Sequence, residues 1–368
     1  MKNESNPKRD IRVALVGFGL GGACFHGPLI VATPGMQLTT VVTSNEARAS
    51  QARRDYPAVH VAATAEWLWD HAADHDLAVI TTPNRVHATL AMAALSVGLP
   101  VVIDKPFART AMEARQVVQT ARERRLPAIP YHNRRWDSDY LTLRRLMNEG
   151  VLGRILRFES RLERWRPEFK GGWRESGAVE EAGGLLYDLG SHLIDQALTL
   201  FGPVREVYAE LDRRRAGAET EDDVFLALTH ANGVRSHLWT SVLAAHCGPR
   251  LRVLGERAAF VKEHADRQEA ALRSANRSVG PNWGEEPSEC WGVLTDGVHE
   301  ESVRSEPGAY QRFYEELAKM LRGEAPPPVE PDDAVAGLEI MEAARRSVAE
   351  RRSVALACEQ PSSRDAVP

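Results

Sequence analysis

The sequence predicts an α/β protein with an N-terminal parallel sheet and a C-terminal α+β domain built on an open, mostly antiparallel sheet. In the first third of the chain, short apolar runs alternate with helix-like stretches, whereas runs of alternating apolar and polar residues follow later. Strands that alternate with helices form βαβ units, and a period of two is typical of strands with one solvated face. A chain of 368 residues is long enough for two domains.

The N-terminal domain is expected over residues 1–130. Its strands are almost purely apolar, as strands buried on both faces are, and they are predicted at residues 11–16, 38–42, 77–80, 101–103 and 127–130. Amphipathic or alanine-rich stretches between them predict helices at residues 46–54, 87–97 and 112–124. Right-handed crossovers would then give a parallel sheet.

The C-terminal domain is expected over residues 131–368. Alternation at 154–164 predicts a half-buried strand. Two more alternating runs, at 223–230 and 234–241, are joined by Asn232-Gly233, which is typical of a tight hairpin. Further strands are predicted at residues 204–211, 251–254 and 259–262, and helices at 141–148, 311–322 and from 332 or 333 to about 350.

Composition argues against several classes of protein. A net charge of −5 gives no electrostatic footprint for nucleic acid or an anionic membrane, and no apolar run has the length of a transmembrane helix. The four cysteines lack the spacing of a metal site and the density of a disulfide scaffold. We therefore expect a cytoplasmic protein with no metal, no nucleic-acid partner and no membrane association.

A glycine-rich turn follows the first predicted strand. Gly17, Gly19 and Gly22, with Phe18 and Leu20 among them, fit the Gly-x-Gly-x-x-Gly pattern between a buried strand and a helix. Glycines allow the tight turn and let backbone amides approach the pyrophosphate of a dinucleotide. The N-terminal sheet is therefore expected to be a Rossmann domain that binds NAD or NADP.

The end of the second strand bears on the choice between these cofactors. An NAD site usually has an acidic residue there, but this strand ends in Thr43-Ser44-Asn45. These small polar groups would tolerate a ribose 2′-phosphate, and Arg48 could approach it, so we favour NADP. The alternative is NAD, with Glu46 turned back towards the ribose.

Two loops at the carboxyl ends of later strands carry polar residues where ligands of open α/β sheets bind. Lys105 is the residue there best suited to chemistry, and the alternative is an ordinary surface lysine. The residues expected to contact the cofactor from these loops are Thr82, Pro83, Asn84, His87, Asp104 and Lys105.

A polar pair interrupts a predicted apolar helix. Asp188 and His192 are four residues apart and so share one helix face. Buried titratable groups need a partner, a cavity or a ligand, so the pair is either a structural ion pair or part of a site. A neutral imidazole can accept a proton and a lysine ammonium can stabilise an oxyanion, so His192 and Lys105 have the groups that acid-base chemistry needs.

Together these residues resemble the glucose-fructose oxidoreductase / inositol dehydrogenase / rhizopine catabolism (Gfo/Idh/MocA) family of NAD(P)-dependent oxidoreductases. The resemblance rests on residues 17–22, 82–84, 104–106 and 183–192, which occur in the family's order. Residues 25–28, 131–137 and 187–192 look most like the NADP-dependent scyllo-inositol dehydrogenase subgroup. The chain departs from the pattern at Asp104, where the family usually has Glu, and at Asn45, where the subgroup often has Arg.

The resemblance implies a role for each catalytic candidate. Lys105 would bond the reacting hydroxyl and relay a proton, Asp188 would bind a neighbouring hydroxyl, and His192 would be the general acid-base. Asn133, Arg134 and Trp136 follow the last buried strand and either face the same cleft or pack at a domain hinge. Residues 165–174 form either a lid or a subunit contact. The complete set of expected substrate contacts is Lys105, Asn133, Arg134, Trp136, Trp165, Tyr187, Asp188 and His192.

The predicted function is hydride transfer between NADP, or NAD, and a secondary alcohol or ketone of an inositol or sugar. A homodimer or homotetramer is expected, because the outer face of the antiparallel sheet carries alternating charges that could pair across a two-fold axis. Three alternatives are a cofactor-binding regulatory protein without catalysis, a reductase of a non-sugar substrate, and redox-assisted glycoside cleavage on a tightly held NAD.

Overall fold

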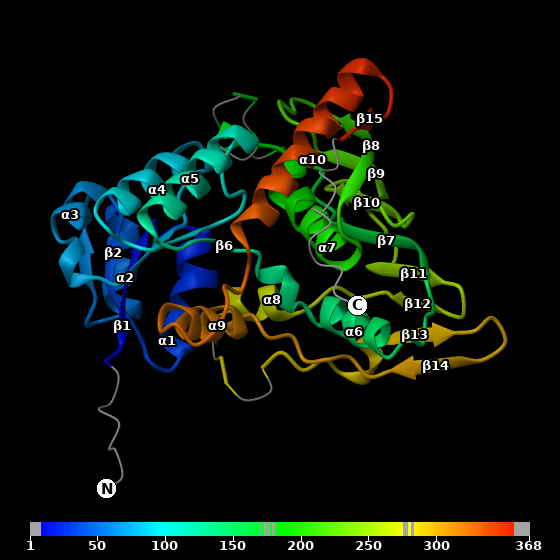
Figure 1. Cartoon of the computed structure of the whole chain (residues 1–368), viewed down its shortest axis with the longest axis horizontal. Coiled ribbons are helices and arrows are strands. Elements are labelled where there is room, and N and C mark those ends of the chain that lie inside the picture. The colour runs from blue at the N-terminus through cyan, green and yellow to red at the C-terminus, as the bar shows by residue number, and fades with distance from the viewer. Residues whose placement is uncertain are drawn as a thin grey trace, which may run out of the picture.

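Two sheets lie side by side in the structure, a computed structural model (Figure 1). It describes residues 9–169, 171–172, 175, 177–178, 181–274, 279–280 and 283–356. The first sheet has six strands and belongs to the N-terminal part of the chain, and the second has nine strands. The predicted fold class is confirmed, because the first sheet is parallel and the second is mostly antiparallel.

The first sheet has the strand order of a doubly wound fold. Its strands, in spatial order, are β3 (His60–Ala62), β2 (Met36–Val42), β1 (Ile11–Val16), β4 (Leu77–Ile80), β5 (Val101–Ile103) and β6 (Ala128–Pro130). The chain builds outwards from β1 in one direction and from β4 in the other, so the order reverses between these two strands. Ligands bind at such a switch point, beyond the carboxyl ends of the strands.

Helices cover both faces of this sheet, which explains why its strands are apolar throughout. Helices α4 and α5 share a core with Ala14 and Val16 of β1, whereas Val13 and Leu15 point to the opposite face, towards α1. The helices of this part are α1 (Gly27–Ala32), α2 (Glu46–Asp55), α3 (Ala65–Asp70), α4 (His87–Ser96) and α5 (Ala111–Arg124). The sequence did not predict β3 or α3, which are short and partly exposed.

The second sheet is open, and among its described strands only the β7–β10 pair is parallel. The predicted hairpin is confirmed, because β9 and β10 pair in antiparallel register on either side of Asn232-Gly233, where Gly233 has a positive φ of 89°. The spatial order is β14 (Glu300–Val303), β13 (Gly292–Thr295), β12 (Ala259–Lys262), β11 (Leu251–Gly255), β7 (Ile155–Glu163), β10 (Arg235–Ser241), β9 (Asp223–His230), β8 (Val204–Asp212) and β15 (Val354–Ala355).

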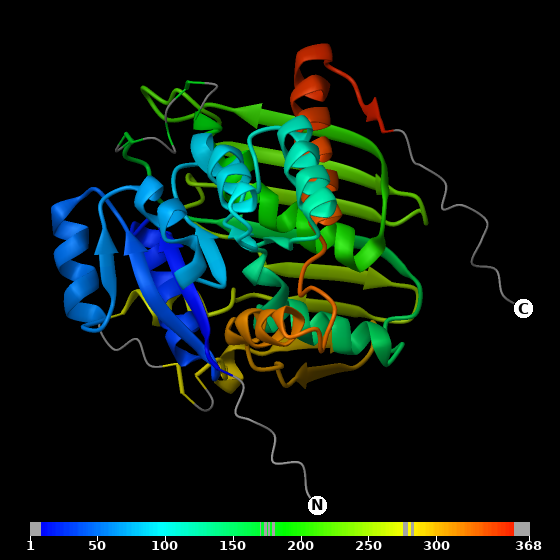
Figure 2. The same cartoon turned by 60° about the vertical axis from the view of Figure 1, so that its left-hand side comes forward.

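Helices α7 and α10 pack on one face of the second sheet (Figure 2). Helix α9 instead packs on the first sheet, where Phe313 and Leu317 join the core around Leu15. A helix from the C-terminal part of the chain therefore belongs to the core of the first sheet. The division into domains near residue 130 stays a prediction. The remaining helices are α6 (Ser138–Asn148), α7 (Ser191–Phe201), α8 (Gln268–Arg273), α9 (Gln311–Leu321) and α10 (Pro331–Glu350).

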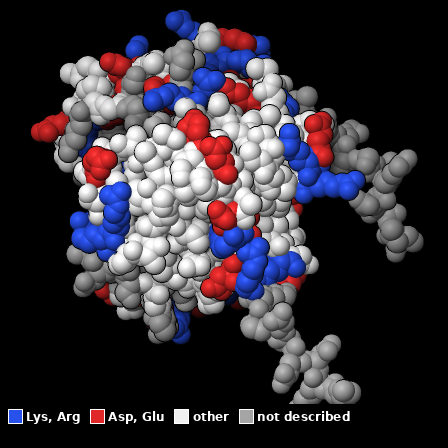
Figure 3. All heavy atoms as spheres, turned by 90° about the vertical axis from the view of Figure 1, so that its left-hand side faces the viewer, with Lys and Arg blue, Asp and Glu red and all other residues white. Residues whose placement is uncertain are grey.

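The face of the molecule that carries α2 and α3 has mixed charge. Figure 3 shows the side of the molecule on which α2 and α3 lie, where cationic and anionic side chains are interspersed around an area that carries neither. Within the described ranges, no helix has the length and apolar character needed to cross a membrane. The same residues contain no group of three or more metal-ligating side chains placed to hold an ion.

Candidate active site

The glycine turn after β1 lies against the loop after β4, as the switch point requires. Gly17 has a φ of 99°, and a Cβ there would lie 2.5 Å from the carbonyl oxygen of Thr81. A Cβ on Gly22 would lie 2.3 Å from the carbonyl oxygen of Gly17. Both positions therefore require glycine, and the turn leaves its backbone open to a close ligand.

A groove runs along this turn and encloses a cavity of about 340 Å³. Its walls come from the ends of β1, β2, β4 and β5 and from Ala182, Gly183, Gly184 and Asp188, which precede α7. The predicted cofactor-binding residues that line it are Gly17, Phe18, Gly19, Leu20, Thr43, Ser44, Thr82, Pro83, Asn84, Asp104 and Lys105. The glycine cradle and this groove fit an extended dinucleotide.

Three predicted cofactor contacts do not line the groove, and each has a structural role instead. Gly22 allows the close packing described above. Asn45 caps α2, because its side-chain oxygen accepts a hydrogen bond from the Arg48 backbone N–H. His87 is buried, and its ring nitrogens lie 2.8 Å from the carbonyl oxygen of Pro106 and 2.9 Å from that of Thr82. It thus holds the two loops together, and burial lowers its pKa.

A cation lies near the end of β2, where an NAD site would have an acid. The Arg48 guanidinium lines the groove with Thr43 and Ser44 and lies 3.8 Å from where a Cβ on Gly19 would be. Among the described lining residues, the carboxylates belong to Asp104 and Asp188, which flank Lys105. Glu46 does not line the groove.

Lys105 joins the two halves of the site. Its Nζ donates a hydrogen bond to Asp188 Oδ1 at 2.8 Å and another to the Asp188 carbonyl oxygen at 2.5 Å. Behind it, the Asp104 carboxylate accepts a hydrogen bond from Thr81 and lies 3.6 Å from His26 Nε2. Burial opposes ionisation of Asp104, but His26 and Lys105 outweigh this effect and hold its pKa below the usual range.

His192 lies in a second cavity on the other side of Lys105. A π-helical turn at Leu186–Gly190 precedes α7, so Asp188 and His192 do not lie on the single regular α-helix that their spacing predicts. His192 is 5% exposed, and its Nδ1 has no hydrogen-bond partner among the described residues. Burial, followed by the charges of Lys105 and Arg134, lowers its pKa well below the usual value, so the imidazole is neutral at neutral pH.

The second cavity has a volume of about 190 Å³ and shares Lys105 and Asp188 with the groove. The predicted substrate contacts that line it are Lys105, Asn133, Arg134, Asp188 and His192. Phe25, Tyr131 and Arg166 also line it, and they fall within the segments 25–28, 131–137 and 165–174, which the sequence had indicated. The sequence did not single out Arg164, Glu269 and Arg273, which line it too. Two sequence patterns could have indicated them: the arginines at 164 and 166, which alternate after β7, and the spacing of four residues between Glu269 and Arg273.

Three predicted substrate contacts lie elsewhere. Trp136 is 6% exposed and packs edge-on against Phe313, because α9 covers it. Trp165 is 56% exposed, because the chain is extended there and its two arginine neighbours point into the cavity. Tyr187 donates a hydrogen bond to the Arg109 carbonyl oxygen on the far side of its helical turn. Of the predicted lid or subunit contact, residues 170, 173 and 174 lie outside the described residues.

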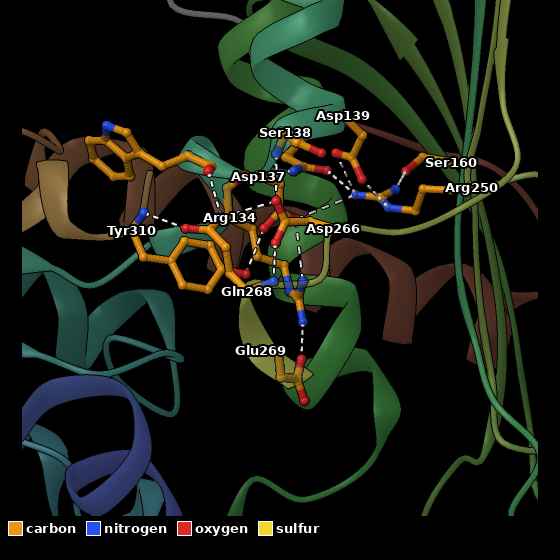
Figure 4. A network of polar contacts seen from close by, with 12 residues as sticks. Arg134, Asp137, Ser138, Asp139, Ser160, Arg250, Asp266, Gln268, Glu269 and Tyr310 are labelled. Carbon is orange, nitrogen blue, oxygen red and sulfur yellow. Dashed lines mark hydrogen bonds and ion pairs between the residues drawn. The ribbon is translucent and has the colours of Figure 1, made fainter. Parts of the chain in front are cut away.

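A buried polar network supports one wall of the second cavity (Figure 4). Arg134 donates to Asp137 at 3.2 Å and to Glu269 at 2.5 Å. Asp137 also accepts a hydrogen bond from Tyr310 and lies 3.9 Å from Arg250. Burial outweighs the effect of Arg134 and raises the Asp137 pKa to about 8. These contacts fix Arg134 in place before any ligand arrives.

Comparison with known proteins covers nearly the whole chain. Residues 11–132 match a family model described as an oxidoreductase family with an NAD-binding Rossmann fold. Residues 144–356 match the model of the C-terminal alpha/beta domain of the same family.

Individual relatives agree with the family models. The chain is 38% identical to YdgJ, an uncharacterized oxidoreductase of Escherichia coli, over 95% of this chain and 99% of the relative. It is 35% identical to the scyllo-inositol 2-dehydrogenase (NADP(+)) IolW of Bacillus subtilis, over 94% of this chain and 96% of the relative. The solved structure of YPO2259 from Yersinia pestis superposes with a TM-score of 0.89 at 36% identity, covering 96% of this chain and 99% of that one. The chain therefore belongs to the Gfo/Idh/MocA family of oxidoreductases, as its motifs predicted.

Proposed function

We propose that this protein is an NADP-dependent dehydrogenase that interconverts a secondary alcohol and a ketone on an inositol or sugar. The observation that carries this proposal is the position of Lys105, which borders both the dinucleotide groove and the cavity that contains His192. A pure cofactor-binding regulator needs no such combination of an ammonium, a carboxylate and a neutral buried imidazole at one junction.

Each residue has a distinct task in this scheme. In the direction of oxidation, the neutral His192 imidazole accepts the hydroxyl proton, and the Lys105 ammonium stabilises the developing alkoxide. Asp188 fixes Lys105 through its 2.8 Å contact and accepts a hydrogen bond from a neighbouring hydroxyl. The bound nicotinamide supplies the hydride chemistry, and the protein supplies position and charge.

The preference for NADP is supported by the end of β2. Arg48, Thr43 and Ser44 line the groove where a ribose 2′-phosphate would lie, and a guanidinium suits a phosphate better than an unmodified ribose. The relative IolW is described as NADP(+)-dependent, which agrees with this assignment.

The test is an assay of wild-type protein with a panel of inositols, aldoses and their carboxylate and phosphate derivatives and with both cofactors, followed by the absorbance of reduced nicotinamide. NADP-linked turnover of at least one polyol is the expected result. Saturable NADPH binding without turnover of any panel member would favour the regulatory alternative instead. Cofactor that stays bound through purification would point to the glycoside-cleaving alternative.

We further propose a homodimer or homotetramer in the cytoplasm. The assembly is suggested by the outer face of the nine-stranded sheet, which carries both cationic and anionic side chains, among them Arg161, Arg252 and Glu159. The described cysteines are all free, which is usual in a reducing compartment. Light scattering coupled to size exclusion measures the assembly, and a monomer would contradict it.

A further inference from the structure

The second cavity carries more positive than negative charge. Its cationic lining residues are Lys105, Arg134, Arg164, Arg166 and Arg273, and its carboxylates are Asp104, Asp188 and Glu269. Two of these carboxylates are already engaged, because Asp188 contacts Lys105, and Asp104 accepts hydrogen bonds from Thr81 and the Lys105 backbone. Glu269 is therefore the carboxylate available to the arginines.

Three guanidinium groups share this one carboxylate. Glu269 lies 2.5 Å from Arg134, 3.3 Å from Arg164 and 2.8 Å from Arg273. Arg166 is exposed beside them and adds a fourth guanidinium to the same wall. A partly buried cluster of this kind is costly unless an anion completes it.

Among the described residues, Arg134 keeps an unpaired donor within the buried part of the wall. Its side chain is 9% exposed, yet its Nε has no hydrogen-bond partner among the described residues. Its second carboxylate, Asp137, lies 3.9 Å from the buried Arg250, and because burial raises the Asp137 pKa to about 8, this group supplies little negative charge at neutral pH (Figure 4). The arginine is thus held rigidly with an unused donor.

Burial and the same excess of positive charge lower the pKa of Arg164. Burial lowers its pKa, and although Glu269 opposes this effect, the neighbouring Arg134 and Arg166 add to it. An anion placed among these groups would restore the balance. Guanidinium groups bind carboxylates and phosphates through paired hydrogen bonds, so the chemistry of the wall selects such an anion.

We propose that the wall formed by Arg134, Arg164, Arg166 and Arg273 binds a carboxylate or phosphate substituent of the substrate. The proposal rests on the proposed function, because the same molecule would present its reacting hydroxyl to Lys105 and His192. The cavity of about 190 Å³ is smaller than the ~300–1,000 Å³ of typical drug-sized sites, so the substrate is a single small polyol with one anionic group. The phosphates of the cofactor belong to the other groove.

The test compares three ligands that share one ring: D-glucose, D-glucuronate and D-glucose 6-phosphate. Calorimetry with the NADPH-saturated protein should show at least about tenfold tighter binding of one anionic ligand than of glucose, a difference that shrinks at high salt. The preferred anion identifies the substituent as a carboxylate or a phosphate. Equal or weaker binding of both anions overturns the proposal.

Substitutions of single arginines test which side chains bind the anion. In Arg164→Gln and in Arg273→Gln, the ratio of anion affinity to glucose affinity should fall about tenfold, whereas the exposed Arg267→Gln in the same segment should keep the wild-type ratio. Unchanged ratios in both cavity variants overturn the proposal. Circular dichroism and the thermal unfolding midpoint report that each variant is folded, and NADPH affinity should stay at the wild-type value. Anion preference without any NADP-linked turnover would refute the proposed function and leave the anion site standing.

Discussion

Replacement of Lys105 by methionine is the most direct test of the proposed chemistry. The change keeps an unbranched chain of similar length but removes the ammonium, and with it the 2.8 Å contact to Asp188. Because Lys105 is 18% exposed and Asp188 33% exposed, Asp188 stays hydrated after the change, and we expect little loss of stability.

The size of the effect follows from the role assigned to the ammonium. Removal of one donor from a developing oxyanion costs about 10²–10³-fold in kcat, or about 2.7–4 kcal/mol. We therefore expect Lys105→Met to lower kcat at least about a hundredfold. NADPH affinity should stay near the wild-type value, because the groove keeps its glycine turn and Arg48.

The assay measures kcat and KM with the best polyol of the panel and NADPH affinity by fluorescence titration. Lys319→Met is the matched control, because this exposed lysine lies on α9 outside both cavities, and it should behave as wild type. A Lys105→Met enzyme with near-normal kcat would refute the catalytic assignment. A large loss of NADPH affinity would show that Lys105 acts on the cofactor rather than on the reacting hydroxyl.

Three further predictions concern other parts of the site. His192→Ala should also lower kcat at least about a hundredfold. In the wild type, burial lowers the His192 pKa, so the imidazole stays neutral as the pH falls through about 6.5, and the rate of oxidation should fall only below that pH. A loss of rate at or above pH ~6.5 would contradict this assignment. Arg48→Gln should weaken NADPH binding about tenfold or more and leave NADH binding nearly unchanged, whereas equal losses for both would remove the 2′-phosphate assignment. Gly17→Ala should abolish NADPH binding, because its Cβ would meet the Thr81 carbonyl, while Gly98→Ala, at a φ of 87° in open space, controls for backbone strain alone; similar NADPH titrations for the two variants would refute the close-approach argument.

Local patterns predicted most of the regular structure. The apolar run of β1 and the Asn232-Gly233 hairpin depend on neighbouring residues, so the sequence reveals them directly. Short or partly exposed elements such as β3, α3 and β15 have too few residues for a period to show. Lys105 and Asp188 were chosen for their chemistry and their place after apolar segments, and the fold brings them within 2.8 Å.

The sequence by itself determined the parallel sheet, the glycine turn and the identity of Lys105, Asp188 and His192 as candidates, because each follows from residues adjacent in the chain. Only the tertiary structure decided which other side chains reach the cavity. Trp136 is covered by α9, which lies far along the chain, while Glu269 and Arg273 arrive from α8 to meet Arg134 and Arg164. Such contacts depend on long-range packing, which no local periodicity encodes.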